Sequence, residues 1–180
     1  KLADHSAMAH RRPYLQRHSL DYSASIQLVV RMSRLGLLSR KATASASGIP
    51  KRFVFFWDET NRPPSIDRLI RSWPAANPDY AGEIFDDVTA KAWLEQEFGA
   101  RHARAFTRAQ HAAMKSDFFR LCYLFRSGGI YADCDDRCRA PLDDWLEGRD
   151  AVLYQENHLS FAVANNFMAC APAQPWLGDA

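Results

Sequence analysis

Three carboxylates stand close together in the middle of the chain, at Asp133, Asp135 and Asp136. They follow the apolar residues 130–132, which predict a short strand. In an extended chain, residues i and i+2 share one face and lie about 6.7 Å apart, so Asp133 and Asp135 would reach toward one point. Two carboxylates held together repel each other, and a hard divalent cation such as Mg²⁺ or Mn²⁺ relieves that repulsion. The pattern predicts a cation site; a solvated acidic turn is the alternative, because D-x-D is common by chance.

A second pair of charged residues, Asp117 and Arg120, lies in a segment that predicts a helix over residues 107–127, capped by Thr107. The spacing of three places both side chains on one side of that helix. Either they point together into a cleft, or they form a surface ion pair worth roughly a few tenths of a kcal/mol. The apolar stripe expected to face the core beside them consists of Met114, Phe118, Leu121, Cys122 and Phe125.

Alternating strands and helices have to position these charged groups. The run from Arg52 to Trp57, RFVFFW, is typical of a strand buried on both faces. Further strands are predicted over residues 80–85, 130–132, 151–154 and 166–170, and further helices over 64–73, ended by Pro74, and 89–98. This alternation predicts an α/β sheet with crossover connections, and the acidic cluster falls at the carboxyl edge, where such sheets bind ligands.

The charge is unevenly divided along the 180 residues. Residues 1–50 hold eight Lys or Arg and two Asp, a net charge of +6, whereas the other 130 hold 15 basic and 19 acidic residues, a net charge of −4. The acidic body predicts no nucleic-acid partner. We expect a basic N-terminal helical extension and linker at residues 1–47, with a helix over 21–38, and one domain at 48–180. That helix either packs on the domain or contacts an anionic membrane or a partner.

The sequence indicates neither a membrane-spanning helix nor a structural metal site. The best apolar stretch, Ile26 to Leu38, is interrupted by two arginines and is shorter than the roughly 20 residues that a spanning helix needs. Four cysteines are too few for a disulfide scaffold and predict a reducing compartment. Cys134 and Cys138 have C-x3-C spacing, but no second Cys or His pair stands nearby to complete a zinc site.

One longer pattern joins the two charged groups: Ser116-Asp117-x-x-Arg120-x-x-x-Leu124-x-x-x-Gly128-Gly129-x-Tyr131-x-Asp133-x-Asp135. It resembles the signature of DXD-containing glycosyltransferases. That group includes the yeast initiating α-1,6-mannosyltransferases, bacterial capsular and lipooligosaccharide sugar transferases and, more distantly, the large clostridial glucosylating toxins. The resemblance covers roughly residues 49–177 and extends to Ile49-Pro50-Lys51 with Trp57, to Pro78-Asp79-Tyr80 and to Pro141-Leu142.

The resemblance implies a GT-A fold, a Rossmann-type mixed sheet flanked by helices. It also implies a UDP- or GDP-linked sugar donor, a saccharide, lipid-linked glycan or protein acceptor, Mn²⁺ or Mg²⁺, and transfer with retention of anomeric configuration. Carried over by position, Asp117 and Arg120 would bind the hydroxyls of the donor sugar. Asp133 would bridge the ribose and the metal environment, and Asp135 would ligate the metal directly.

Other residues of the pattern keep two interpretations each. Trp57 either stacks on the nucleobase or is a core aromatic, and Tyr131 is better suited to supporting its strand than to touching the donor. Asn165 and Asn166 either reach the sugar or acceptor or form a structural turn. Asp136 either supports the metal ligands from behind or is merely solvated, and we favour solvation. No protein nucleophile is assigned.

Some features depart from the family pattern. The family places a further metal or diphosphate contact after the strand at 166–170, so the end at Ala180 predicts a short or absent acceptor-binding half. Cys134 is unusual inside the acidic motif, and the nearby Cys138 suggests oxidative inactivation. The lack of a membrane anchor predicts a bacterial cytoplasmic protein, with peripheral contact to the inner membrane through residues 1–47 as an option.

Two other functions compete with glycosyl transfer. A phosphatase of the haloacid dehalogenase type also has D-x-D after a strand, but it wants Thr or Val where Arg137 stands. The second rival is a non-catalytic or degenerate sugar-nucleotide- or glycan-binding module of the same fold. The intact pair Asp133 and Asp135 argues against a loss of metal binding, so a turnover assay separates the module from the enzyme.

Overall fold

The computed structural model describes residues 48–155 and 163–178. The predicted extension and linker at residues 1–47, including the helix over 21–38, lie outside the described residues. None of the helices in the described ranges has the length and apolar character needed to cross a membrane.

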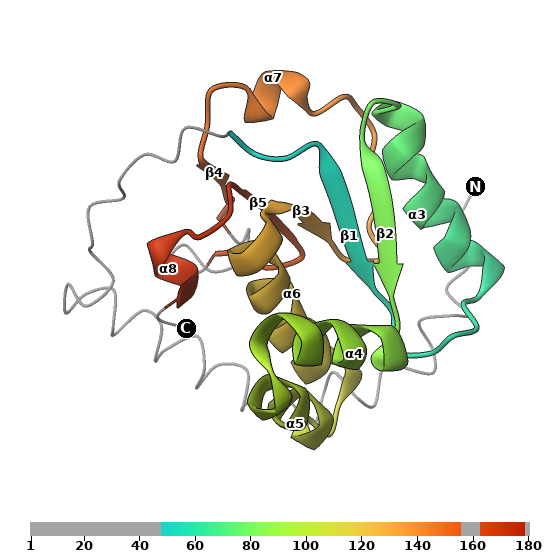
Figure 1. Cartoon of the computed structure of the whole chain (residues 1–180). Helices are drawn as coiled ribbons and strands as arrows, with labels where there is room; N and C mark the ends of the chain where they lie inside the picture. Colours follow the sequence, from blue (N-terminus) through green and yellow to red (C-terminus); the bar gives the residue numbers. More distant parts are fainter. Residues whose placement is uncertain (1–47, 156–162, 179–180) are drawn as a thin grey trace. The chain divides into compact units, whose positions relative to one another are not determined.

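A five-stranded mixed sheet organises the described residues (Figure 1). Its strands are β1 (Arg52–Phe56), β2 (Ala81–Phe85), β3 (Gly129–Ala132), β4 (Ala151–Val152) and β5 (Phe167–Cys170), in the order β2-β1-β3-β5-β4. β1 pairs in parallel with β2 and β3, whereas β5 is antiparallel to both β3 and β4. The prediction of an α/β mixed sheet is confirmed, and every predicted strand is present within a few residues.

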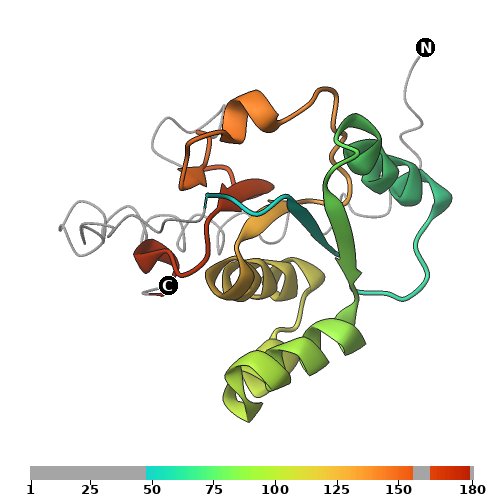
Figure 2. The same ribbon diagram turned by 45° about the horizontal axis from the view of Figure 1, so that its top comes forward.

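Helices cover both faces of the sheet: α3 (Pro64–Ala76), α4 (Asp87–Phe98), α5 (Ala100–Arg108), α6 (Ala112–Ser127) and the short α7 (Asp143–Leu146) and α8 (Pro175–Gly178). Figure 2 shows α3 and α7 on one side, with α4, α5 and α6 on the other. β1 is buried from Phe53 to Phe56 because its side chains alternate between two cores. Phe53 and Phe55 pack with α3, and Val54 and Phe56 pack with α4 and α6. This two-sided burial explains the continuous apolar run of β1.

Two predicted helix boundaries are wrong. Pro74 lies inside the last turn of α3, which ends at Ala76 and is capped by Asn77, whose side-chain amide donates to the Trp73 carbonyl at 3.0 Å. A proline so near the end removes one helical hydrogen bond without ending the helix. Thr107 does not cap α6 but lies in the last turn of α5, where its hydroxyl donates to the Ala103 carbonyl at 2.8 Å. α6 begins five residues later, at Ala112, after an extended His111.

The buried face of α6 also differs from the predicted stripe. Met114 is 52% exposed, and the other four residues of the stripe are only partly buried at the edge of the core. The buried residues of the helix are Ser116, Phe119, Arg120, Tyr123 and Leu124. Apolar side chains surround this helix on nearly every side, so its period does not select one face. The face that tertiary packing selects includes Arg120.

Gly128 and Gly129 turn the chain from α6 into β3. Gly128 has φ 62° and ψ −165°, a conformation that essentially only glycine adopts. A Cβ there would lie 2.7 Å from the Pro172 nitrogen and 2.8 Å from the Cys170 carbonyl oxygen. The entry into β3 therefore depends on the absence of a side chain at this position.

We predict that Gly128→Ala lowers the free energy of unfolding well beyond the ~1–3 kcal/mol of backbone strain alone, because the methyl group also collides with backbone atoms that cannot move easily. Gly99→Ala is the matched control, since Gly99 has a similar conformation (φ 83°, ψ 176°) with open space around its Cβ position. Urea unfolding of both variants measures the difference. Equal losses would show that the close approach to Cys170 and Pro172 is unimportant.

Candidate functional site

The acidic cluster forms a turn, which we call the acidic turn (residues 133–136), directly after β3. The Asp136 N–H donates to the Asp133 carbonyl at 3.0 Å, and the Asp133 N–H donates to the Asn166 carbonyl at 2.8 Å. The strand pairing ends at Ala132, so the i, i+2 geometry of an extended strand does not apply, and that part of the sequence argument is wrong. The acidic turn nevertheless stands at the carboxyl end of β3, as predicted.

Asp133 is the most constrained carboxylate of the acidic turn. Its Oδ1 accepts a hydrogen bond from the Tyr131 hydroxyl at 3.0 Å and lies 3.4 Å from the Arg120 guanidinium. Burial raises the pKa of Asp133 to about 6, against the lowering effect of Arg120 and Tyr131 and together with repulsion from Asp135 and Asp136. Although the Arg120 guanidinium lies beside it, the surroundings of the Asp133 side chain disfavour its negative charge.

The Arg120 guanidinium is the centre of this cluster and is only 4% exposed. Its Nη2 lies 3.0 Å from Asp117 Oδ1 and 2.9 Å from the Ser116 hydroxyl oxygen. Nη1 donates to the Asn165 carbonyl, and the guanidinium lies 4.4 Å from the centre of the Tyr131 ring. Asp117 and Arg120 are therefore not a surface ion pair, because one buried cation faces two carboxylates.

Asp117 remains partly accessible beside Arg120. Its side chain is 39% exposed, and Oδ1 accepts a hydrogen bond from the Asn165 amide at 3.1 Å. Burial raises the pKa of Asp117, and Arg120 opposes that rise. The structure thus joins Asp117, Arg120, Asp133 and Asn165 in one network, with Asp117 at its accessible end.

Tyr131 is fully buried beneath this network. Its hydroxyl lies 2.6 Å from the Ser116 hydroxyl and donates to Asp133. Burial raises the pKa of Tyr131 well above its ordinary value, so the phenol stays protonated and keeps its donor. These contacts agree with a supporting role for Tyr131; its contact with a donor stays a prediction.

The end of β1 lies beside the acidic turn. The Cys134 thiol donates to the Phe56 carbonyl at 3.2 Å, one residue before the half-buried Trp57, which packs against the core of α3. The stacking of Trp57 on a nucleobase stays a prediction. Cys134 and Cys138 are both buried, and burial raises the pKa of Cys134 to about 12. A buried, protonated thiol reacts slowly, which argues against the oxidative inactivation that the spacing suggests.

Asp136 is held at the other end of the acidic turn. Its Oδ2 accepts a hydrogen bond from the Asn166 amide at 2.7 Å, and its carbonyl accepts one from the Trp73 indole at 3.3 Å. Burial raises the pKa of Asp136, and Asn166 opposes the rise. Asp136 is therefore not merely solvated, contrary to the interpretation that the sequence favoured. No sequence signal connects it to Trp73, because 63 residues separate the two.

Asp135 stands exposed between these two anchored carboxylates. Within residues 48–155 and 163–178, no group of three or more His, Cys, Asp or Glu side chains could hold a metal ion. The chain offers carboxylates of the acidic turn that repel one another, and Mg²⁺-type ions are commonly bound by one or two carboxylates completed by substrate phosphates. The residues present fit a divalent cation shared with a phosphorylated ligand, and do not fit an all-protein cage.

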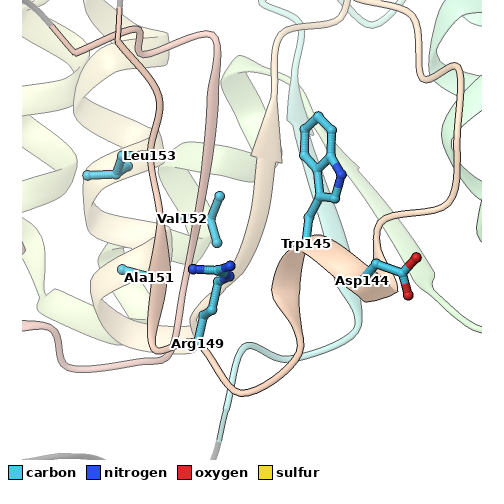
Figure 3. Close-up of a pocket in the computed structure, with 6 residues that line it drawn as sticks. All are labelled: Asp144, Trp145, Arg149, Ala151, Val152 and Leu153. Atoms are coloured by element: carbon cyan, nitrogen blue, oxygen red, sulfur yellow. The ribbon is translucent and has the colours of Figure 1, made fainter.

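A separate surface pocket of about 320 Å³ lies between α7 and the edge strand β4 (Figure 3). Its lining residues are Asp144, Trp145, Arg149, Ala151, Val152 and Leu153. Through β5, Ala151 is level with Gly129 at the start of β3, whereas the acidic turn follows the end of β3. None of the predicted site residues lines this pocket.

Comparison with known families gives a match over half of the chain. The model of the family described as "Glycosyltransferase sugar-binding region containing DXD motif" matches residues 63–152. This range contains the charged residues of α6 and the whole acidic turn.

Two yeast proteins are similar in sequence. The initiation-specific alpha-1,6-mannosyltransferase of Candida albicans is 29% identical over 120 residues, which cover 63% of this chain and 31% of the relative. The protein of the same name from Saccharomyces cerevisiae is 31% identical over 108 residues, covering 56% and 22%. The matches therefore span between about a fifth and a third of the length of these relatives.

Among solved structures, the PaToxG glycosyltransferase superposes with a TM-score of 0.57 and 18% sequence identity, covering 86% of this chain and 65% of that chain. At this identity the likeness concerns the fold alone. It confirms the GT-A-like mixed sheet flanked by helices.

We predict that Asp133→Asn stabilises the metal-free protein at pH 7.5, by at most about 3 kcal/mol. A pKa of about 6 against an ordinary 3.8 means that the folded state binds the proton of Asp133 more tightly than the unfolded state does. Protonation therefore stabilises the wild type fully below about pH 4, and this stabilisation is lost as the pH rises through 6. Urea unfolding in EDTA between pH 4 and 8 measures it. If the extra stability of Asp133→Asn over the wild type did not shrink toward pH 4, the raised pKa of Asp133 would be contradicted.

Removing the buried guanidinium of Arg120 should destabilise the fold. We expect Arg120→Ala to lower the free energy of unfolding by about 3–5 kcal/mol, because Asp133 would lose its buried counter-charge. Arg126→Ala is the control on the same helix, since Arg126 forms an exposed pair with Glu97 and should cost less than ~1 kcal/mol. If chemical denaturation gave similar losses of unfolding free energy for the two variants, Arg120 would contribute no more to stability than an exposed ion pair does.

Proposed function

The chain belongs to the family of glycosyltransferase sugar-binding regions that contain a DXD motif, and from this premise we propose that it transfers a sugar from a nucleotide-sugar donor to an acceptor. The reaction that we propose needs a divalent cation, Mn²⁺ or Mg²⁺, and retains the anomeric configuration. The acceptor is a saccharide, a lipid-linked glycan or a protein. The two yeast relatives are named as mannosyltransferases, so a mannose donor is the first to test.

One observation carries the proposal: an exposed carboxylate, Asp135, stands beside a second, half-buried one, Asp133, that Arg120 and Tyr131 hold in place. We assign both carboxylates to the cation, because each repels the other in its absence. A divalent cation bound there supplies Lewis-acid stabilisation of the charge that develops on the departing diphosphate.

The remaining roles follow from accessibility. Asp117 keeps an accessible carboxylate edge, and we assign it to the hydroxyls of the donor sugar. Arg120 is too buried to be a major contact surface and acts mainly by fixing Asp117 and Asp133. Trp57, beside the acidic turn, is the candidate for the nucleobase, and Asn166 the further candidate for the sugar. No side chain is assigned as a nucleophile.

Calorimetric titration tests the proposal directly. UDP-glucose, UDP-galactose, UDP-N-acetylglucosamine and GDP-mannose are each titrated with Mn²⁺ and again with EDTA, and release of the nucleoside diphosphate measures turnover. We expect one donor to bind with Mn²⁺ and not with EDTA. Asp135→Asn should abolish this metal-dependent binding without changing the melting temperature, because Asp135 is exposed.

Asp144→Asn is the matched control, since Asp144 is an exposed carboxylate on α7, beside the pocket at the other end of β3. Its donor binding should equal that of the wild type. Unchanged binding by Asp135→Asn would remove this residue from the site, and binding of a donor that survives EDTA would overturn the metal dependence. Metal-dependent binding without turnover on any acceptor would favour the non-catalytic binding module.

A further inference from the structure

A network of hydrogen bonds from three distant parts of the chain holds the acidic turn. Trp73, on α3, donates to the carbonyl of Asp136, and Asn166, just before β5, donates to its carboxylate. Tyr154, two residues after β4, donates from its hydroxyl to Asn166 Oδ1 at 3.0 Å. The contacts form a chain, from Tyr154 to Asn166 to Asp136, that ends one residue from Asp135.

The aromatic rings of this region form a stack, which we call the aromatic brace (Trp73, Phe167 and Tyr154). The centres of the Trp73 and Phe167 rings lie 5.9 Å apart with an angle of 16° between their planes. Phe167 and Tyr154 are also 5.9 Å apart, with an angle of 26°. The two outer rings carry the donors that lead to Asp136, so the brace fixes both donors relative to each other.

The Asn166 amide is held between Tyr154 and Asp136. An amide offers a donor on one side and an acceptor on the other, and it can turn over unless its partners distinguish the two. The Asp136 carboxylate only accepts, so it selects Nδ2, and Oδ1 is left to accept from the Tyr154 hydroxyl, which holds the amide in place. In the opposite orientation Oδ1 would face Asp136, and two acceptors would repel each other.

We propose that Tyr154 and Asn166 are positioning residues which, through Asp136, hold the acidic turn in the conformation that presents Asp135 to a cation. The proposal rests on the proposed function, because it assumes that the acidic turn binds a divalent ion. Asp133 is fixed from the other side by Tyr131 and Arg120. Asp135 is exposed and accepts no hydrogen bond from any residue in the described ranges, so the anchors on either side of it determine where it stands.

Tyr154 allows a clean test because its side chain is 42% exposed, so the loss of one hydroxyl should leave the fold intact. Tyr154→Phe keeps the ring of the aromatic brace and removes only the donor. The readout is the dissociation constant of Mn²⁺, alone and in the presence of UDP or GDP, from the free-ion signal in electron paramagnetic resonance, together with the melting temperature. We expect Mn²⁺ to bind about tenfold more weakly, the effect typical of losing a group that orients a metal ligand, with the melting temperature nearly unchanged.

Two further variants show whether the effect passes through Asn166. Asn166→Ala should weaken Mn²⁺ binding at least as much, and Tyr154→Phe combined with Asn166→Ala should be no weaker than Asn166→Ala alone, because Tyr154 acts through that amide. Tyr80→Phe is the control: its hydroxyl also donates to a carboxylate, Asp143, at 2.6 Å, at the start of α7 and outside the acidic turn. Its Mn²⁺ affinity should equal that of the wild type.

Each outcome decides the question. Unchanged Mn²⁺ affinity in Tyr154→Phe, with or without a lower melting temperature, would overturn the positioning role while leaving the proposed function in place. Additive losses in the double variant would overturn the chain through Asn166. A wild type that binds Mn²⁺ neither alone nor with UDP or GDP would overturn both the metal dependence of the proposed function and this inference.

Discussion

The buried guanidinium of Arg120 is the interaction on which the rest of the site depends. It is almost fully enclosed, yet it faces Asp117 and Asp133, and its plane lies near the Tyr131 ring. The half-buried carboxylate of Asp133 would otherwise be still harder to ionise, and a protonated carboxyl is a poor ligand for a cation. Arg120 thus opposes, without cancelling, the cost of keeping a negative charge at the end of β3.

The acidic turn is anchored at both ends and exposed between them. Tyr131 and Arg120 hold Asp133 from the side of α6, and Asn166 and Trp73 hold Asp136 from β5 and α3. Such an arrangement fixes the backbone of the acidic turn before a ligand arrives, which reduces the ordering that binding requires. Asn165 and Asn166 directly precede the antiparallel strand β5, so the mixed sheet positions two of the contacts.

Much of the fold could be predicted because its signals are local. The apolar run of β1 and the glycines before β3 each act through neighbouring residues. The core face of α6 could not, since apolar residues surround that helix. The boundary between α5 and α6 was missed for a related reason: Thr107 bonds back into its own helix instead of starting the next.

The candidate site divides in the same way. The sequence by itself determined the types and spacing of Asp117, Arg120, Asp133 and Asp135, and hence the family. These residues stand at the spacing of the family pattern, on one helix and at the end of one strand. Only the tertiary structure decided that Arg120 is buried, that Asp136 is bonded and not solvated, and that Trp73 and Tyr154 reach the acidic turn. These partners lie 12 to 63 residues apart, and packing against a shared core brings them together, which no local pattern records.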